Sequence, residues 1–285
     1  MTPDNAYLTI IASTIGPQSM HLDGAATIAN ELGLNNVNDT TSSGLRPSIF
    51  AVPFERGEDG RAMELLSVSE QDALMAVSPL VSVQRNGALY SEGEDANFIY
   101  NLVEGVAETY RLHADGEKRI TAFLFPRDLL GLSANGAYVA SARAITTLSA
   151  FRIPVGQLRT ILKGNPALDI SLVCKLCHEL RSAQYHSMTV SKRDASVRLA
   201  SFLLWMDQAT AGPAGDVAAL ALPMSRHDIA DYLGLSVEAV SRAFNALESK
   251  GLIKREGTRA VSLLERKKLC ALTGQSCSVR IDMGN

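Results

Sequence analysis

The sequence predicts an α+β protein built from an N-terminal antiparallel β domain, a long helix and a C-terminal winged helix-turn-helix. Three observations predict this fold class. Residues 81–153 contain short β-type runs separated by glycine and aspartate, a pattern typical of an antiparallel barrel or sandwich. Residues 166–190 repeat apolar side chains with a helical period. Residues 222–263 indicate two helices joined by a tight turn and followed by a short hairpin.

The composition is that of a globular protein with two domains and an extension. The 285 residues include 46% hydrophobic and 20% charged side chains, with a net charge of −3. The longest apolar run near the start, residues 7–15, is too short to span a bilayer. A secretory signal would require a lysine or arginine before this run, and none is present. We therefore expect a cytoplasmic protein.

Residues 1–61 are predicted to form a partly disordered N-terminal extension. They are rich in Thr, Ser, Asn and Gly, and the first 60 residues carry seven acidic side chains and two arginines. This composition favours an acidic arm that buries little apolar surface. A dedicated sensor or partner-binding segment is the alternative.

Residues 62–165 are predicted to form the β domain. One or two helices are expected between residues 62 and 80, where Leu, Met and Val recur. Turn signals such as Asn86-Gly87 separate the strands that follow. The strand candidates are residues 81–83, 97–103, 105–112, 117–125 and 142–153.

A long helix is predicted over residues 166–190, directly after Asn165-Pro166. Its apolar residues leave a seam that its own domain does not need, and such a seam favours pairing with a second copy, as in a coiled coil. We therefore expect a homodimer. The residues assigned to the dimer contact are Leu172, Val173, Leu176 and Leu180.

The first helix of the predicted helix-turn-helix begins after Ser225. Ser225 followed three residues later by Asp228 is a variant of the capping box. Gly234 suits the left-handed backbone that ends a helix and allows a sharp turn. Ser236 can then cap a second helix that extends to about Lys250.

The second helix has two faces of opposite character. The buried stripe predicted from the i, i+3, i+4, i+7 spacing comprises Val240, Ala243, Phe244 and Leu247. A helix-turn-helix places the opposite, polar face in the DNA major groove, where Arg can bond guanine, Glu the cytosine amino group, and Ser a base or a phosphate. The residues assigned to base reading are Glu238, Ser241 and Arg242, and those assigned to phosphate contact are Ser225, Arg226, Ser236, Asn245 and Lys254. The alternative is a solvated polar face on an ordinary helical hairpin.

Residues 252–263 strengthen the DNA-binding interpretation. Two apolar runs around Glu256-Gly257 predict a hairpin wing. Between Arg242 and Lys268 the chain carries eight lysines or arginines against three glutamates, a local basic patch of the kind that phosphate binding needs. We therefore expect double-stranded DNA as a partner.

The run SRHDIADYLGLSVEAVSR, with the E-x-x-S-R pattern of Glu238, Ser241 and Arg242, resembles the Crp/Fnr transcription regulators, in particular their Fnr and FixK branch. The resemblance extends back to about residue 62. It implies a β-roll sensor domain of the cyclic-nucleotide-binding-like jelly-roll type, and a DNA-binding domain over residues 191–285 whose first helix covers residues 191–206. It also implies a homodimer that reads a palindromic site of the type TTGAT-N4-ATCAA, with RNA polymerase as a further partner.

The resemblance does not extend to the nucleotide pocket of the family's cyclic-nucleotide members. Those members use a G-E-L stretch and a later Arg-Ser or Arg-Thr. Here Gly131 is present, but Leu132 stands in place of the acid and Ala140 in place of the phosphate-binding arginine. We therefore expect weak or no cyclic-nucleotide binding, although Arg143 lies three residues later.

The four cysteines are Cys174, Cys177, Cys270 and Cys277. Cys174-Lys-Leu-Cys177-His178 spells the attachment motif of c-type haem, but its place inside a predicted helix argues against haem and favours apolar packing. The [4Fe–4S] cluster of Fnr itself is not implied, because no cysteine precedes Cys174. We expect no cofactor and no metal site, and a redox role for the cysteines stays open.

The sequence thus predicts a transcription regulator and not an enzyme, since no nucleophile–base pair, carboxylate pair or glycine-rich phosphate loop occurs at a useful spacing. One alternative keeps the DNA-binding role but gates it by an unidentified small ligand or a cysteine redox switch. Another is a scaffold whose winged helix binds protein, which would show no salt-dependent affinity for DNA.

Overall fold

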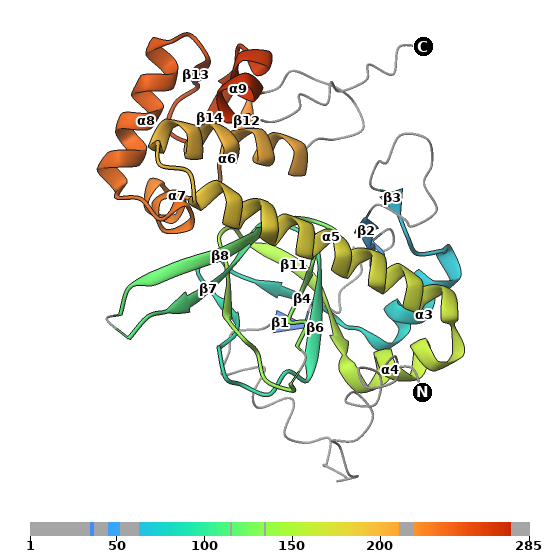
Figure 1. Ribbon diagram of the computed structural model, residues 1–285. Coiled ribbons are helices and arrows are strands. Elements are labelled where there is room, and N and C mark those ends of the chain that lie inside the picture. The colour runs from blue at the N-terminus through green and yellow to red at the C-terminus, as the bar shows by residue number, and fades with distance from the viewer. Residues whose placement is uncertain are drawn as a thin grey trace, which may run out of the picture.

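The computed structural model of the protein describes residues 45–51, 63–114, 116–133, 135–210 and 219–274, together with the backbone of residues 35–36. Figure 1 shows a β domain below a mostly helical C-terminal domain, with the long helix α5 (Pro166–Val190) lying along the β domain and leading to the helical one. The α+β class predicted from the sequence is confirmed.

The β domain consists of two antiparallel sheets, as the jelly-roll expectation requires. The first sheet has the order β1-β4-β11-β6-β9 and the second the order β5-β10-β7-β8. The strands of the first sheet are β1 (Asn35–Asn36), β4 (Leu80–Val83), β6 (Phe98–Glu104), β9 (Leu129–Leu130) and β11 (Leu148–Pro154). Those of the second sheet are β5 (Ala88–Tyr90), β7 (Ala107–Leu112), β8 (Lys118–Leu124) and β10 (Ser141–Ala144). Side chains from both sheets form one buried core.

The single strand predicted over residues 142–153 is wrong, because the chain changes sheets within it. β10 pairs with β5 and β7, whereas β11 pairs with β4 and β6. Both halves are extended and only three residues separate them, so the sequence pattern alone does not mark the crossing. The crossing packs closely on the preceding turn: Gly105 has a φ of 82°, and a Cβ there would lie 2.5 Å from the carbonyl oxygen of Thr147. Only glycine fits this position without a shift of the backbone.

Part of the region assigned to the N-terminal extension packs on the β domain. β2 (Phe50–Ala51) pairs with β3 (Met63–Glu64), and Ile49 is buried. The buried amide of Asn101 holds this segment, since it accepts a hydrogen bond from the Ser48 amide and donates one to the Ser48 carbonyl. The prediction for residues 1–34, 37–44 and 52–61 falls outside the described residues.

Two short helices close one end of the β domain. α3 (Val68–Val77) begins at a capping box in which Ser67 and Glu70 bond each other's backbone amides. α4 (Val155–Gly164), which the sequence analysis did not predict, follows β11 directly and buries Leu158. Both helices share a core with the start of α5, where Leu168 is fully buried.

An ion-pair group under α5 ties the long helix to its own β domain. Lys175 is 1% exposed, and its Nζ lies 2.7 Å from Asp128 Oδ1 and 2.8 Å from Glu179 Oε1. Burial alone would lower the pKa of Lys175, but the attraction of the two carboxylates outweighs it and raises that pKa. The lysine is therefore charged and acts as the counter-ion that both acids need.

Lys175→Met should lower the free energy of unfolding by about 3 kcal/mol, because it leaves two partly buried carboxylates without their cation. Urea unfolding followed by circular dichroism measures the change. Lys163→Met, at an exposed position of α4, is the control and should change stability by less than about 0.5 kcal/mol. Equal effects of the two substitutions would contradict this account of the ion-pair group.

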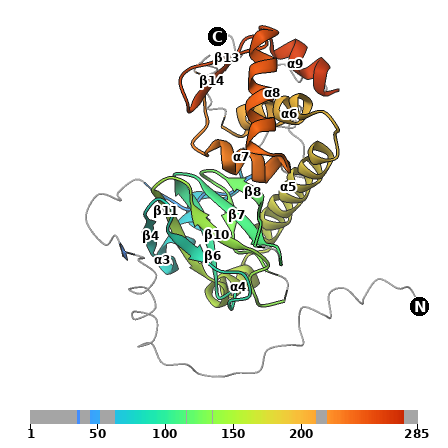
Figure 2. The ribbon, with the colours of Figure 1, turned by 90° about the vertical axis from the view of Figure 1, so that its left-hand side faces the viewer.

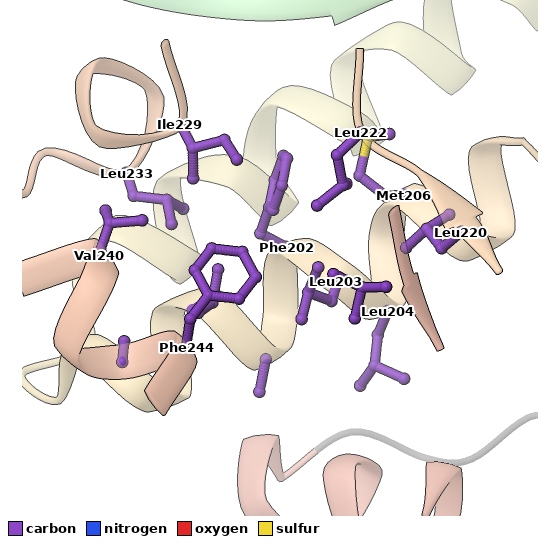
Figure 3. Close-up of a cluster of buried hydrophobic side chains, with 14 of the residues drawn as sticks. Phe202, Leu203, Leu204, Met206, Leu220, Leu222, Ile229, Leu233, Val240 and Phe244 are labelled. Carbon is purple, nitrogen blue, oxygen red and sulfur yellow. The ribbon is translucent and has the colours of Figure 1, made fainter. Parts of the chain in front are cut away.

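In the described residues, the C-terminal domain consists of four helices and a small sheet around one core. Its elements are α6 (Ala195–Ala209), β12 (Leu220–Ala221), α7 (Arg226–Leu233), α8 (Val237–Ser249), β13 (Ile253–Arg255), β14 (Ala260–Leu263) and α9 (Arg266–Thr273). Figure 3 shows side chains of α6, α7 and α8 pointing into one shared core. The predicted wing is confirmed as β13 and β14, and β12 adds a third strand beside β14.

The predicted first helix starts later than residue 191. Asp194 caps α6, since its carboxylate accepts hydrogen bonds from the amides of Ser196 and Val197. Residues 191–194 therefore form a short connector between α5 and the C-terminal domain. None of the helices in the described part of the chain combines the length and the apolar content that a bilayer span requires.

Candidate nucleic-acid interface

The predicted capping of both helices of the helix-turn-helix is confirmed. The Ser225 hydroxyl accepts from the Asp228 amide at 3.1 Å, and the Asp228 carboxylate accepts from the Ser225 amide at 2.9 Å. Gly234 ends α7 in the left-handed conformation, with a φ of 61°. The Ser236 hydroxyl then accepts from the Ala239 amide and starts α8. These local bonds fix the angle at which α8 leaves the turn.

α8 has the two faces that its sequence predicts. The stripe turned into the core is 0–2% exposed and comprises Val240, Ala243, Phe244 and Leu247. The opposite side chains are exposed and comprise Glu238, Ser241, Arg242 and Asn245. The three residues assigned to base reading thus lie together, near the N-terminal end of the helix, on a face that the rest of the described chain leaves uncovered.

The carboxylate of Glu238 is held in its ionised form. Hydrogen bonds from its own backbone amide and from the Ser236 hydroxyl lower the pKa of Glu238. An ionised carboxylate at this position accepts hydrogen bonds and donates none. Its chemistry therefore matches an amino group on a base edge and repels a phosphate.

Arg226 packs on an aromatic side chain of α8. Its guanidinium lies 3.5 Å from the centre of the Phe244 ring, a stacked geometry that restricts its rotamers. Burial and the neighbouring Arg255 lower the pKa of Arg226. Arg226 and Arg255 therefore lie close together between the start of α7 and the wing, beside α8.

A contact that the sequence pattern did not predict ties α8 to the wing formed by β13 and β14. Glu248 of α8 accepts from the Arg255 amide at 2.9 Å and from its Nε at 2.8 Å. Seven residues separate the partners, and only the fold of the α8–β13 turn brings them together. Lys254, assigned to phosphate contact, is exposed, and its Nζ lies 3.0 Å from Oε1 of Glu256, two residues further along the chain.

Arg198 of α6 holds the turn between α7 and α8 in place. Its Nη1 donates to the carbonyls of Leu233 and Gly234, and its Nε donates to the Lys192 carbonyl. One side chain thus donates hydrogen bonds to carbonyl groups at the end of α7 and in the connector that follows α5. No residue spacing predicts this role of Arg198, because the three acceptors are backbone groups.

Tyrosine rings fill the interior of the β domain next to Gly131. The rings of Tyr90 and Tyr138 stack with their centres 3.9 Å apart, and the centre of the Tyr100 ring is 5.8 Å from that of Tyr90. All three side chains are buried. The three rings are part of the packed core between the two sheets.

Arg143 points away from that interior. On β10 the small side chains Ala142 and Ala144 face the core, while Arg143 lies on the outer face and pairs with Glu108. The alternation of a strand therefore places the one nearby cation on the wrong side of the sheet for the nucleotide pocket.

The exposed residues of α5 differ in part from the predicted dimer seam. Val173, Leu176 and Leu180 are 43–60% exposed, as a docking seam needs. Leu172, however, packs against its own domain, because the first turns of α5 lie on the β domain. Ile170, which the sequence analysis did not assign, is 55% exposed instead.

The cysteines of α5 lie on different sides of the helix. Cys174 is 3% exposed and faces the β domain, whereas Cys177 is exposed beside Leu180. Cys270 is buried in α9, and Cys277 falls outside the described residues. Across the part of the chain that the structure describes, His, Cys, Asp and Glu nowhere form a group of three that could hold a metal ion.

Comparison with known proteins agrees with this architecture domain by domain. The family model "Crp-like helix-turn-helix domain" matches residues 197–272, and "Cyclic nucleotide-binding domain" matches residues 80–165. The "Transcriptional activator protein anr" of Pseudomonas aeruginosa is 32% identical over 212 residues, which are 73% of this chain and 86% of that protein. The "Nitrogen fixation regulation protein FixK" of Bradyrhizobium diazoefficiens is 34% identical over 165 residues, covering 58% of this chain and 70% of that protein.

A solved structure extends the agreement to the fold. FixK2 from Bradyrhizobium japonicum superposes with a TM-score of 0.65 at 32% identity, covering 71% of this chain and all of that one. The β-roll, the long helix and the winged helix-turn-helix with its exposed polar face define a DNA-binding transcription regulator. The chain belongs to the Crp/Fnr family of such regulators. Because this family is not enzymatic, the prediction that the chain is no enzyme is confirmed.

Proposed function

We propose that the protein acts as a homodimer that binds a palindromic site of the type TTGAT-N4-ATCAA. Glu238, Ser241 and Arg242 of each protomer contact base edges in one half-site. The residues that contact the flanking phosphates are Ser225, Arg226, Ser236, Asn245 and Lys254. The observation that carries this proposal is the polar face of α8, which stays exposed opposite a fully buried apolar stripe.

The dimer part of the proposal rests on the exposed side of α5. Ile170, Val173, Cys177, Leu180 and Gln184 are all exposed and follow one another at intervals of 3, 4, 3 and 4 residues. This spacing is the a/d repeat of a coiled coil. Four of the five side chains are apolar or sulfur-containing, so exposure to water is unfavourable unless a second copy covers them. A parallel pair of α5 helices would present the two copies of α8, the recognition helices, with two-fold symmetry.

Cys177 should cross-link the two protomers. It occupies a seam position between Val173 and Leu180, so the two Cys177 thiols of a parallel, in-register dimer face each other. Treatment with a short bismaleimide should yield covalent dimers on a denaturing gel, and Cys177→Ser should abolish them. Cys174→Ser, a change at a buried thiol three residues away, should leave the yield unchanged. Cross-links that survive Cys177→Ser would contradict the in-register seam.

Selection of duplexes from a random pool tests the DNA-binding proposal. The expected result is an inverted repeat whose two halves have the same spacing in all selected sequences. Recovery of random sequences, with no enrichment, would reject it. A parallel selection without reductant tests the cysteine alternative, because a redox switch would change the enrichment.

The relative named above as a transcriptional activator suggests how the bound protein would act. We infer that the protein acts in the cytoplasm and activates transcription by contacting RNA polymerase. A reporter promoter carrying the selected site should respond to the wild-type protein and lose that response when the site is scrambled.

A further inference from the structure

Three strands of the β domain present charged side chains to the first helix of the helix-turn-helix. Glu108 lies on β7, Lys118 on β8 and Arg143 on β10, and they meet Asp228 and Asp231 of α7. Figures 1 and 2 both place α7 beside β8, at the junction of the two domains. We call these five residues the interdomain charge cluster.

Each cation of the cluster bridges the two domains. Lys118 Nζ lies 3.0 Å from Glu108 Oε1 and 3.1 Å from Asp228 Oδ1, with Asp231 Oδ2 at 3.7 Å. Arg143 lies 2.6 Å from Glu108 Oε1 and 3.5 Å from Asp228 Oδ1. The Glu108 side chain is fully buried and the Lys118 side chain is 18% exposed. Water therefore screens these pairs less than it screens surface ion pairs.

The two oxygens of Asp228 have separate tasks. Oδ2 accepts from the Ser225 amide and hydroxyl in the capping box, while Oδ1 faces the cations of the β domain. Burial would raise the pKa of Asp228, but the hydrogen bonds from Ser225 and Lys118 outweigh it and lower that pKa. The start of α7 is thereby fixed to the β domain, and α7 packs directly on α8.

An apolar contact next to the cluster joins the same elements. Phe123 of β8 lies 4.9 Å from Tyr232 of α7, ring centre to ring centre, and both belong to a buried cluster that spans the two domains. Apolar contact stabilises the association of the two domains but does not fix their relative orientation, whereas charge pairs at defined positions do. While the cluster is closed, Glu238 and Arg242 remain exposed. The orientation that it favours thus leaves the recognition face free for DNA.

We propose that the interdomain charge cluster orients the winged helix-turn-helix for binding a palindrome, with Glu108, Lys118 and Arg143 as positioning residues. This inference rests on the proposed function. A dimer gains affinity for a palindrome only when both recognition helices meet their half-sites at a fixed separation. A domain that pivots on its apolar contact lowers the effective concentration of the second helix at the second half-site.

The test removes the cluster's charges from the β domain, while Asp228 and Asp231 of α7 keep theirs. The full-length triple variant Glu108→Gln, Lys118→Met, Arg143→Met should bind the palindromic duplex about tenfold more weakly, because the second contact is less well placed. Its affinity for a duplex with one half-site should stay at the wild-type value. Hydrogen exchange should become faster in α7. The control, Lys118→Arg with Arg143→Lys, keeps both cations and should retain the wild-type ratio of the two affinities.

A wild-type ratio in the triple variant would overturn the proposal. If the triple variant does not fold, Asp231→Lys gives the same test from the other domain, since it opposes Lys118 without touching the cap of α7, and an unchanged ratio again overturns it. Failure of the proposed function has a different signature, because the wild-type protein would then bind palindromic and random duplexes alike.

Discussion

Arg242→Ala should lower the affinity for the specific duplex by about 1–3 kcal/mol, roughly 5- to 150-fold. The Arg242 guanidinium is exposed on the outer face of α8, one helical turn after Glu238 and next to Ser241. Its planar fork can donate two parallel hydrogen bonds to guanine O6 and N7, which alanine cannot replace. Titration of a labelled specific duplex and a random duplex at one fixed salt concentration measures the loss.

Two further variants separate base reading from charge. Arg242→Lys keeps the positive charge but loses the fork, so it should reduce specific affinity while leaving random-duplex affinity near the wild-type value. Arg159→Ala removes the same charge from an exposed position of α4, away from the recognition helix, and should change neither affinity. An equal loss on both duplexes for Arg242→Ala would mean that Arg242 contacts phosphate and not a base.

Leu180→Glu is expected to convert the dimer to monomers. Leu180 is 60% exposed and lies in the middle of the proposed seam, so a dimer would bury two glutamates against each other without partners. The dimer dissociation constant should rise by at least about 100-fold, and the protein should lose its preference for a palindrome over a single half-site. Sedimentation equilibrium and duplex titration measure the two effects.

Val139→Glu is the matched control, because Val139 is also 60% exposed but lies in a loop of the β domain. The same change in charge should leave the oligomeric state unaltered there. If Leu180→Glu sedimented as the wild-type protein does, α5 would not form the dimer contact, and the seam would need another position.

The helix-turn-helix could be predicted in detail because its signals are local. The capping of α7 by Ser225 and Asp228 and the turn at Gly234 each depend on residues within one or two helical turns. The stripe of α8 follows from a period of 3.6 residues, which applies to every helix regardless of its neighbours. Local interactions of this kind can be recognised without knowing the rest of the fold.

The contacts between elements could not be predicted, since they join residues far apart in the chain. The pair of Lys118 and Asp228 spans 110 positions, and each residue alone resembles an ordinary surface charge. Leu172 shows the same limit within one helix. The helical period places Leu172 on the apolar stripe of α5, but only the position of the β domain decides that Leu172 packs against its own domain.

Binding to palindromes of altered spacing tests the central claim most directly. If two recognition helices held by a pair of α5 helices read one duplex, inserting five base pairs between the half-sites rotates one half-site to the opposite side of the DNA. The affinity should then fall by about 100-fold, to that of a single half-site. Lengthening the insertion to one full helical turn of DNA should recover only part of the lost affinity. Equal affinity for all spacings would contradict a rigid two-fold dimer that reads both halves at once.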